Sequence, residues 1–187
     1  RQRQMCIRDR VLVENRARII RKIEPLCESI ILAYQPSENG SDALADIISG
    51  EINPSGKLPI TYPKYTNSLI LYDHKYTDQL NLNNGLGAFD PQFEFGHGLS
   101  YTNFEYSDLK VNKTDDNESI HIFVNVTNKG NRDGKESVLV FVSDLYASIT
   151  PSVKRLRKFE KQMIKVGETR AFEFVIDTNE LAFVNIY

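Results

Sequence analysis

One stretch, Phe93–Tyr106, constrains the fold of this chain more than any other. It reads F-E-F-G-H-G-L-S-Y-T-N-F-E-Y and holds five aromatic residues and two glycines. Glycine adopts backbone angles that are closed to other residues, so the chain can turn sharply here while neighbouring side chains enter apolar pockets. We therefore expect a docking corner in which Phe95, Leu99 and Tyr101 are buried. The sequence before it has mixed helix and strand patterns, whereas the sequence after it has strand patterns only.

Two apolar runs near the start, Val11–Val13 and Ser29–Tyr34, predict buried strands. The residues between them, Arg18–Leu26, predict a short helix. A strand, helix, strand order is typical of parallel strands in an α/β layer. A second helix is predicted next, with Ser41 as its N-cap and Gly50 as the residue that ends it.

The segment that follows predicts little regular structure. Asn53–Gly56 has the proline and glycine of a turn, and Leu58–Tyr62 alternates like a strand that its prolines keep short. Lys64–Pro91 is rich in Asn, Tyr, Asp and Gly, which predicts a long surface loop between domains.

Strand patterns occupy the rest of the chain. Ser119–Asn128 alternates apolar and polar residues, Asn128–Lys135 has the composition of a hairpin loop, and Ser137–Ser143 is the next strand. Gly167 predicts a turn, and the alternation returns at Phe172–Ile176. Short strands at regular spacing predict a β-sandwich.

Three motifs resemble glycoside hydrolase family 3. The corner resembles F-x-F-G-x-G-L-S-Y-T-x-F-x-Y, Asp42–Pro63 is similar to A-I-A-D-V-L-x-G-x-x-N-P-S-G-K-L-P-x-T-x-P, and Val124–Glu136 to V-x-V-x-N-x-G-x-R-D-G-x-E. The resemblance covers Val11–Tyr187 and implies the C-terminal part of such an enzyme. The implied fold class is α/β followed by all-β, namely the end of an α/β sandwich joined by a long loop to a fibronectin-III-like, immunoglobulin-like β-sandwich.

The expected domain organisation has four parts. Residues 1–10, R-Q-R-Q-M-C-I-R-D-R, resemble translated adapter sequence, and we exclude them from fold prediction in preference to a basic arm. Residues 11–63 form the α/β part, residues 64–103 the interdomain loop and hinge, and residues 104–187 the fibronectin-III-like domain. That domain normally continues for another strand or two, so we expect an unpaired edge, marginal stability and edge-driven association.

Composition excludes several functions. The chain has 23 Lys and Arg against 25 Asp and Glu, a formal charge of −2, so we expect no nucleic-acid partner. The basic cluster Lys154–Lys161 is interpreted as a solvated strand face and not as a binding patch. No apolar run is long enough to span a membrane. Cys6 and Cys27 do not have the spacing of a metal-ligand pair, and we expect no metal and no cofactor.

The candidate catalytic residues are few. Retaining glycosidases need two carboxylates about 5 Å apart, and no decisive pair is evident. Glu38 follows a predicted strand and is the best lone candidate. The resemblance gives it a structural role at the following helix start, because the family's nucleophilic aspartate lies in an N-terminal barrel and its acid/base glutamate upstream of Val11. Asp42 and Asp46 are interpreted as a helix-start charge and a turn anchor. We therefore predict no catalytic residue in this chain.

His74, His97 and His121 lack metal-ligand spacing. His97 is interpreted as an aromatic filler between the corner glycines.

One group of aromatic side chains leaves two interpretations open. They either offer rings to sugars or pin the long loop to its own domain, and the second is favoured. The group comprises Tyr62, Tyr65, Tyr72, His74 and Tyr76. We also hypothesise that the loop borders the leaving-group side of the parent's active site.

The resemblance implies a parent enzyme of the β-glucosidase type that hydrolyses terminal O-glycosidic bonds with retention. Its expected substrate is a β-linked oligosaccharide or an aryl glycoside, its missing partner is the N-terminal barrel domain, and its implied location is periplasmic or secreted. The chain itself is expected to be an inactive scaffold. The alternative is a stand-alone β-sandwich that binds carbohydrate or mediates adhesion.

Overall fold

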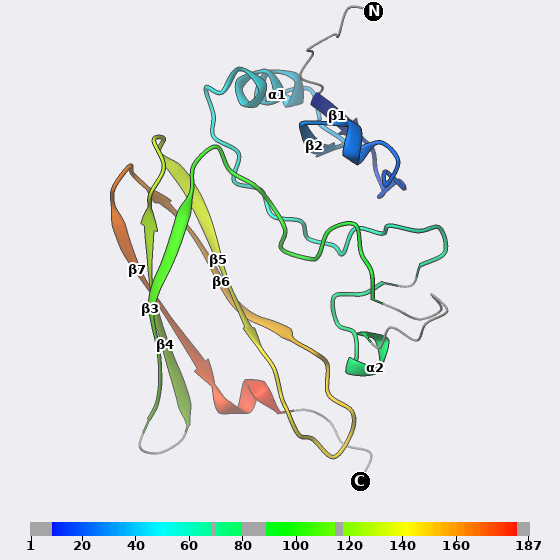
Figure 1. Ribbon diagram of the computed structural model, residues 1–187. Helices are drawn as coiled ribbons and strands as arrows, with labels where there is room; N and C mark the ends of the chain where they lie inside the picture. The colour runs from blue at the N-terminus through cyan, green and yellow to red at the C-terminus, as the bar shows by residue number, and fades with distance from the viewer. Residues whose placement is uncertain (1–8, 69, 80–88, 115–117, 183–187) are drawn as a thin grey trace, which may run out of the picture.

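The computed structural model describes residues 9–68, 70–79, 89–114 and 118–182. Figure 1 shows a small lobe that contains both strands and helix, a long irregular segment, and a larger all-β part. Strand content predominates, and the regular helices are α1 (Gly40–Ser49) and the short α2 (Tyr76–Gln79). Residues 1–8 of the predicted non-native segment lie outside the described residues, and β1 begins at Asp9.

The small lobe contains the predicted parallel strands. β1 (Asp9–Val13) pairs in parallel with β2 (Ser29–Tyr34), with Leu12 opposite Leu32. Leu12, Ile20 and Tyr62 are buried together and form the core of this lobe. The parallel pairing predicted from the sequence is therefore confirmed.

The helix predicted at Arg18–Leu26 is wrong. Only a 3-10 turn, η1 (Glu24–Leu26), is present, with Pro25 in its first turn. A helix of this length is marginal in water, and Ile20 instead points into the core, where it is 3% exposed. Burial of one apolar side chain has outweighed local helix propensity.

Helix α1 begins one residue before Ser41. Its N-cap is Asn39, which makes no side-chain capping hydrogen bond, so the prediction of a Ser41 cap is wrong. Gly50 ends the helix as predicted, in the left-handed conformation with φ of 80°. Ile48 on the apolar face is 56% exposed. That face is thus only partly covered within the described residues.

The described part of the chain between Glu51 and Asn103 is mostly irregular. Residues 53–57 form no turn, so the turn predicted at Asn53–Gly56 is wrong. The predicted strand at Leu58–Tyr62 is reduced to one antiparallel bridge between Tyr62 and Phe93. Pro59 and Pro63 have no N–H to extend the ladder.

The all-β part contains two antiparallel sheets. One has the order β3-β4-β7, from β3 (Phe104–Lys113), β4 (Ser119–Asn128) and β7 (Thr169–Asp177). The other pairs β5 (Gly134–Val142) with β6 (Arg155–Ile164). A 3-10 turn, η2 (Thr178–Leu181), follows β7.

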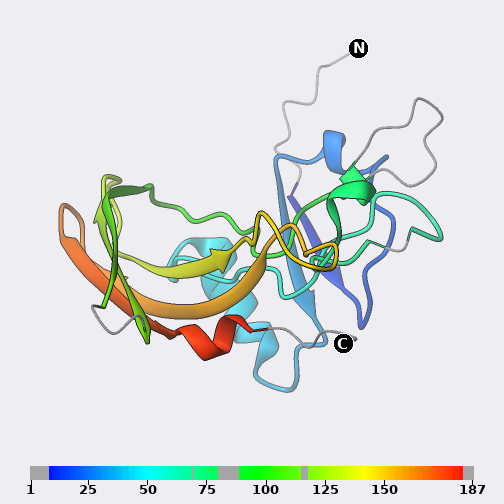
Figure 2. The same ribbon diagram turned by 90° about the horizontal axis from the view of Figure 1, so that it is seen from below.

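The two sheets share one core, and Figure 2 shows them curving past each other. Val126, Ile164 and Phe172, from three strands in both sheets, are each 0% exposed. The predicted alternation in β4 and β7 is confirmed, and Gly167 lies in the turn between β6 and β7 with φ of 73°.

The connection Asn128–Lys135 is not a hairpin, because β4 and β5 belong to different sheets. Local turn composition does not distinguish a hairpin from a crossing between sheets.

Part of the inner face of the larger sheet is uncovered. Tyr106 lies opposite Val126, and Val111 opposite Ile122, so both point to the same side as these buried residues. Tyr106 is nevertheless 48% exposed and Val111 61% exposed. Among the described residues β5 pairs with β6 alone, and β3 with β4 alone. The smaller sheet therefore covers the inner face of β3 only in part.

Candidate functional site

The predicted catalytic candidates do not form a site. Glu38 is exposed in the turn before α1, and its carboxylate makes no hydrogen bond to the helix start within the described residues. Asp42 is exposed in the first turn of α1, and Asp46 is half-buried one turn later. No cluster of three or more His, Cys, Asp or Glu side chains that could hold a metal occurs in the part of the chain that is described.

The three histidines are dispersed. His74 is 5% exposed and stacks on Phe89 with ring centroids 3.7 Å apart. His97 stacks on Phe93 at 4.9 Å, the contact expected of an aromatic filler. His121 lies 3.5 Å from a carboxylate oxygen of Glu173 on the outer face of the sandwich.

The residues that do converge lie where the small lobe meets the sandwich, a region that we call the junction. It comprises residues 53–57, 95–101 and 132–136 together with Lys161. Several kinds of contact hold it together, and the first is centred on Asn53.

The Asn53 amide connects three segments. Its Oδ1 accepts hydrogen bonds from Ser100 Oγ at 2.9 Å and from the Tyr101 backbone N–H at 2.8 Å. Its Nδ2 donates to the carbonyl of Asp133 at 3.0 Å. One side chain from the irregular segment thus fixes both the corner and the β4–β5 connection.

A charge pair lies beside it. Lys57 Nζ is 3.3 Å from Glu136 Oε1, and the Glu136 side chain is only 8% exposed. The same lysine donates to the carbonyl of Gly98 at 3.0 Å, and the Tyr106 hydroxyl donates to Glu136 Oε1 at 2.8 Å. Burial of the hydroxyl, and then the negative charge of Glu136, raise the pKa of Tyr106 above its ordinary value. The carboxylate is therefore paired and hydrogen-bonded, as a buried charge requires.

Two glycines of the corner are required for different reasons. Gly96 has φ of 84°, and a Cβ there would lie 2.7 Å from Leu139 Cδ1. Gly98 does not have a positive φ, but a Cβ on it would lie 2.1 Å from the carbonyl oxygen of Gly56. The prediction of special backbone angles is confirmed for Gly96, whereas at Gly98 the cause is the close approach of two backbone segments.

Arg132 joins the sandwich to the end of α1. Its guanidinium donates to the carbonyl of Gly50 and lies over the Tyr101 ring, 6.0 Å from the centroid. The Tyr101 hydroxyl donates to the carbonyl of Ile47 at 2.9 Å. Both groups satisfy carbonyls at the helix C-terminus, where a cation is also favoured by the helix dipole.

Two predictions of burial at the corner are wrong. Leu99 is 78% exposed and Tyr101 is 43% exposed. The polar contacts of Ser100 and the Tyr101 hydroxyl set the direction of this segment, and Leu99 consequently points outward. Phe95 is half-buried, as part of the next contact.

Aromatic rings make a further contact between the irregular segment and the sandwich. Tyr72 stacks on Phe95 with centroids 4.5 Å apart, and Phe95 meets Phe141 edge-on at 6.2 Å. Beyond them the backbone N–H of Val153 donates to the carbonyl of His74 at 2.9 Å. The long loop is therefore attached to the β5–β6 connection.

These contacts favour the pinning interpretation of the tyrosine group. Tyr62 is 1% exposed, and its hydroxyl accepts from the Arg18 N–H at 3.2 Å. Tyr65 donates to Asp90, whose pKa is lowered mainly by its hydrogen bond from Lys64. Tyr76 is 42% exposed.

The basic cluster at Lys154–Lys161 is spread over several partners. Lys154 pairs with Glu94 at 2.9 Å, Lys158 with Glu180 at 3.0 Å, and Lys161 donates to Ser55 at 3.3 Å. These side chains belong to the junction and to the sandwich surface.

The polar residues of the junction were missed by the sequence reasoning. Asn53, Lys57 and Glu136 all lie within the quoted motifs, but local patterns assigned Asn53 to a turn and gave the other two no role. Their partners lie 30 or more residues away in sequence, so no local periodicity indicates the contacts. The available signal was that all three residues stand at specified positions of the family motifs.

Fold and junction together define a class of protein: a chain in which an α/β lobe is attached through polar and aromatic contacts to a sandwich of the fibronectin III type. Residues 9–101 match the Glycosyl hydrolase family 3 C-terminal domain, and residues 136–187 match the Fibronectin type III-like domain. The chain belongs to glycosyl hydrolase family 3.

Its relatives include named glycosidases. It is 36% identical to the lysosomal beta glucosidase of Dictyostelium discoideum over 94% of this chain and 22% of that protein. It is 34% identical to a putative beta-xylosidase of Formosa agariphila, over 94% of this chain and 24% of that protein. It is 32% identical to the periplasmic beta-glucosidase of Salmonella typhimurium, again over 94% of this chain and 24% of that protein.

A solved structure shares the fold. The beta-glucosidase of Listeria innocua, in complex with isofagomine, superposes with a TM-score of 0.86 at 28% identity, over 95% of this chain and 27% of that one. The chain thus spans about a quarter of the length of the proteins that it matches.

Proposed function

We propose that this chain is the C-terminal part of a retaining, exo-acting β-glycosidase and serves that enzyme as a scaffold. The junction carries this proposal, because the contacts of Asn53, Lys57 and Arg132 hold two domains together and place no pair of acids at a common site. In the parent, two carboxylates about 5 Å apart would attack the anomeric carbon and protonate the leaving oxygen. We assign both to the part of the enzyme outside this chain, with the nucleophile in an N-terminal barrel.

The proposed architecture follows the same division. Residues 11–63 form the end of an α/β sandwich, residues 64–103 the loop and hinge, and residues 104–187 the fibronectin-III-like domain. The half-exposed apolar face of α1, with Ile48 56% exposed, supports a larger α/β layer that would cover it. A stand-alone sandwich module gives no reason for a lobe attached through several kinds of polar and aromatic contact.

The proposed substrate is a β-linked oligosaccharide or an aryl β-glycoside. Relatives named as glucosidases and as xylosidases support this class and leave the sugar open. Names that include a lysosomal and a periplasmic enzyme support a periplasmic or secreted parent. No helix in the described part of the chain is long and apolar enough to cross a membrane.

Hydrolysis of a panel of aryl β-glycosides tests the assignment of the acids. We expect the purified chain to be folded by circular dichroism and to release no aryl group, and Glu38→Gln in the complete enzyme to keep its turnover. Activity in the purified chain that disappears in Glu38→Gln would place a catalytic carboxylate here and overturn the proposal.

The scaffold role has its own test in the complete enzyme. Lys57→Met is expected to lower the temperature of thermal inactivation while kcat/KM at 25 °C stays within about threefold, because the loss of a contact between domains acts mainly on stability. Tyr72→Ala tests whether the loop borders the active site, since only then would it change aglycone preference.

A further inference from the structure

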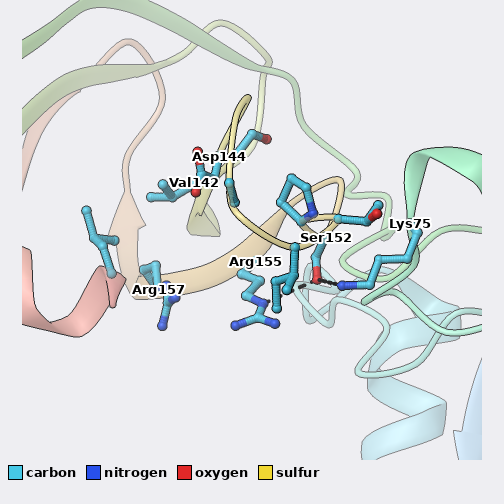
Figure 3. Close-up of a pocket in the computed structure, with 12 residues that line it drawn as sticks. Lys75, Val142, Asp144, Ser152, Arg155 and Arg157 are labelled. Carbon is cyan, nitrogen blue, oxygen red and sulfur yellow. Dashed lines mark hydrogen bonds between the residues drawn. The ribbon is translucent and has the colours of Figure 1, made fainter. Parts of the chain in front are cut away.

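A cavity of about 320 Å³ opens at the end of the sandwich, away from the junction. It lies between the last residues of β5, the start of β6, the connection between them, and Lys75 of the long loop. Figure 3 shows the side chains that surround it. This volume is at the lower end of the range of small-ligand sites and matches one sugar ring.

Two arginines of the same strand border this cavity. Val140 pairs with Lys158 and Phe141 with Leu156, which leaves Arg157 as an extra residue in a β-bulge. Bulges redirect side chains, and Figure 3 shows the guanidinium groups of Arg155 and Arg157 extending in the same direction. The sheet therefore presents a paired set of planar donors at this point.

Arg157 has a donor with no acceptor. Its Nε is buried and makes no hydrogen bond within the described residues. Arginine carries five N–H donors and no acceptor, so this group can be satisfied only by an oxygen acceptor that the described residues do not supply. Buried polar groups are otherwise paired in folded proteins, so the unpaired Nε makes Arg157 a candidate binding residue.

The charge around the cavity is positive. Lys75, Arg155 and Arg157 line it, and Asp144 is the only acidic residue among the lining side chains. Arg155 lies 3.8 Å from Asp73, and its Nε donates to Ser152 Oγ at 3.4 Å, so that group is already oriented. An anion would enter an excess of positive charge and a preformed donor arrangement.

The remaining lining suits a sugar ring. Ser143 and Thr150 supply hydroxyl groups, and Ile149 and Leu181 supply an apolar wall. A pyranose presents hydroxyls at its edge and C–H groups on its face, so both kinds of surface have a counterpart. Carboxylate is an anion whose two oxygens match an arginine fork, as those of phosphate also do.

We propose that this cavity binds a uronic acid residue of a polysaccharide, with the sugar carboxylate on Arg157 and Arg155. The site rests on the proposed glycosidase function for its sugar class and lies on the fibronectin-III-like domain. It would hold an acidic substituent of the polymer while the parent acts on a terminal sugar elsewhere.

Titration of the isotope-labelled chain by NMR tests the site. The probe is methyl β-D-glucuronide, and the control is methyl β-D-glucoside, which lacks the carboxylate. We expect saturable shifts in residues 142–157 with the glucuronide, at least tenfold weaker binding of the glucoside, and weaker binding as salt concentration rises. Equal binding of both sugars, or none of the glucuronide, overturns the proposal.

Variants locate the binding and separate it from a general charge effect. Arg157→Gln and Arg155→Gln should each weaken glucuronide binding at least tenfold, and two variants guard against one that fails to fold. Lys165→Gln removes the same charge from an exposed residue of the β6–β7 turn and should leave binding unchanged. Loss of binding in Lys165→Gln, or retention in both arginine variants, contradicts the assignment.

Sodium sulfate distinguishes a sugar site from a site for any anion. If sulfate competes as strongly as the glucuronide, the uronic acid assignment is wrong. The assay measures no hydrolysis, so a parent that cleaves no glycoside would overturn the proposed function without affecting this result.

Discussion

Lys57 Nζ lies 3.3 Å from Glu136 Oε1, across the boundary between the irregular segment and the sandwich. The two residues are separated by 79 positions and belong to different sequence motifs. Because the carboxylate is almost fully buried, the pair ties the stability of one domain to the placement of the other. This contact is the basis of the first prediction.

Lys57→Met should destabilise the chain by about 3 kcal/mol, since it leaves a buried carboxylate without its cation. Glu136→Gln in the same chain should recover part of that loss, because the neutral amide no longer needs a counter-charge. Urea unfolding of the wild type, both single variants and the double variant measures the coupling. Additive effects would show that the two groups do not interact.

Gly98→Ala should be much more damaging than Gly56→Ala. A Cβ at Gly98 would lie 2.1 Å from a backbone oxygen, whereas a Cβ at Gly56 meets nothing within 4 Å. We expect a loss of about 3 kcal/mol or more for the first and a change within about 0.5 kcal/mol for the second. Thermal unfolding of the two variants provides the comparison, and similar melting temperatures would contradict the close approach.

Stability should fall at alkaline pH through Tyr106. Its folded pKa is raised above the ordinary value of 10.0, so the folded state holds the phenol proton more tightly than the unfolded state. The contribution is complete below about pH 10 and is lost as pH rises toward the folded pKa, by at most about 1.4 kcal/mol for each pH unit. Urea unfolding between pH 9 and 11 measures it.

Tyr106→Phe serves as the control for that pH dependence. It removes the ionising group and retains the ring, so its stability should fall less steeply than that of the wild type over the same range. Parallel curves for the two proteins would show that other groups, such as the lysines, account for the alkaline loss.

Val111→Lys should reduce self-association of the purified chain. Val111 faces inward on β3 but is 61% exposed, beside an unpaired strand edge, and a lysine there blocks edge-to-edge pairing. Val166→Lys, at a residue 51% exposed in the β6–β7 turn, is the matched control and should have no effect. Sedimentation velocity at several concentrations measures the association. A wild type that stays monomeric with a sharp melt would contradict the predicted association.

The sequence by itself determined the elements whose cause is local. Alternation placed β4 at Ser119–Asn128, and glycine chemistry placed the end of α1 at Gly50, because the pleat and the left-handed angle depend only on neighbouring residues. The parallel pairing of β1 and β2 was also predicted, although the helix expected between them is reduced to a 3-10 turn. The three sequence motifs were enough to indicate the family.

Only the tertiary structure decided what lies between these elements. Asn53 was predicted in a turn and instead bonds to Ser100, Tyr101 and Asp133, while Leu99 was predicted to be buried and is exposed. The sheet to which β5 belongs and the bulge at Arg157 are equally invisible in local patterns. In each case the deciding contact joins residues far apart in sequence, and its energy exists only once the chain has folded.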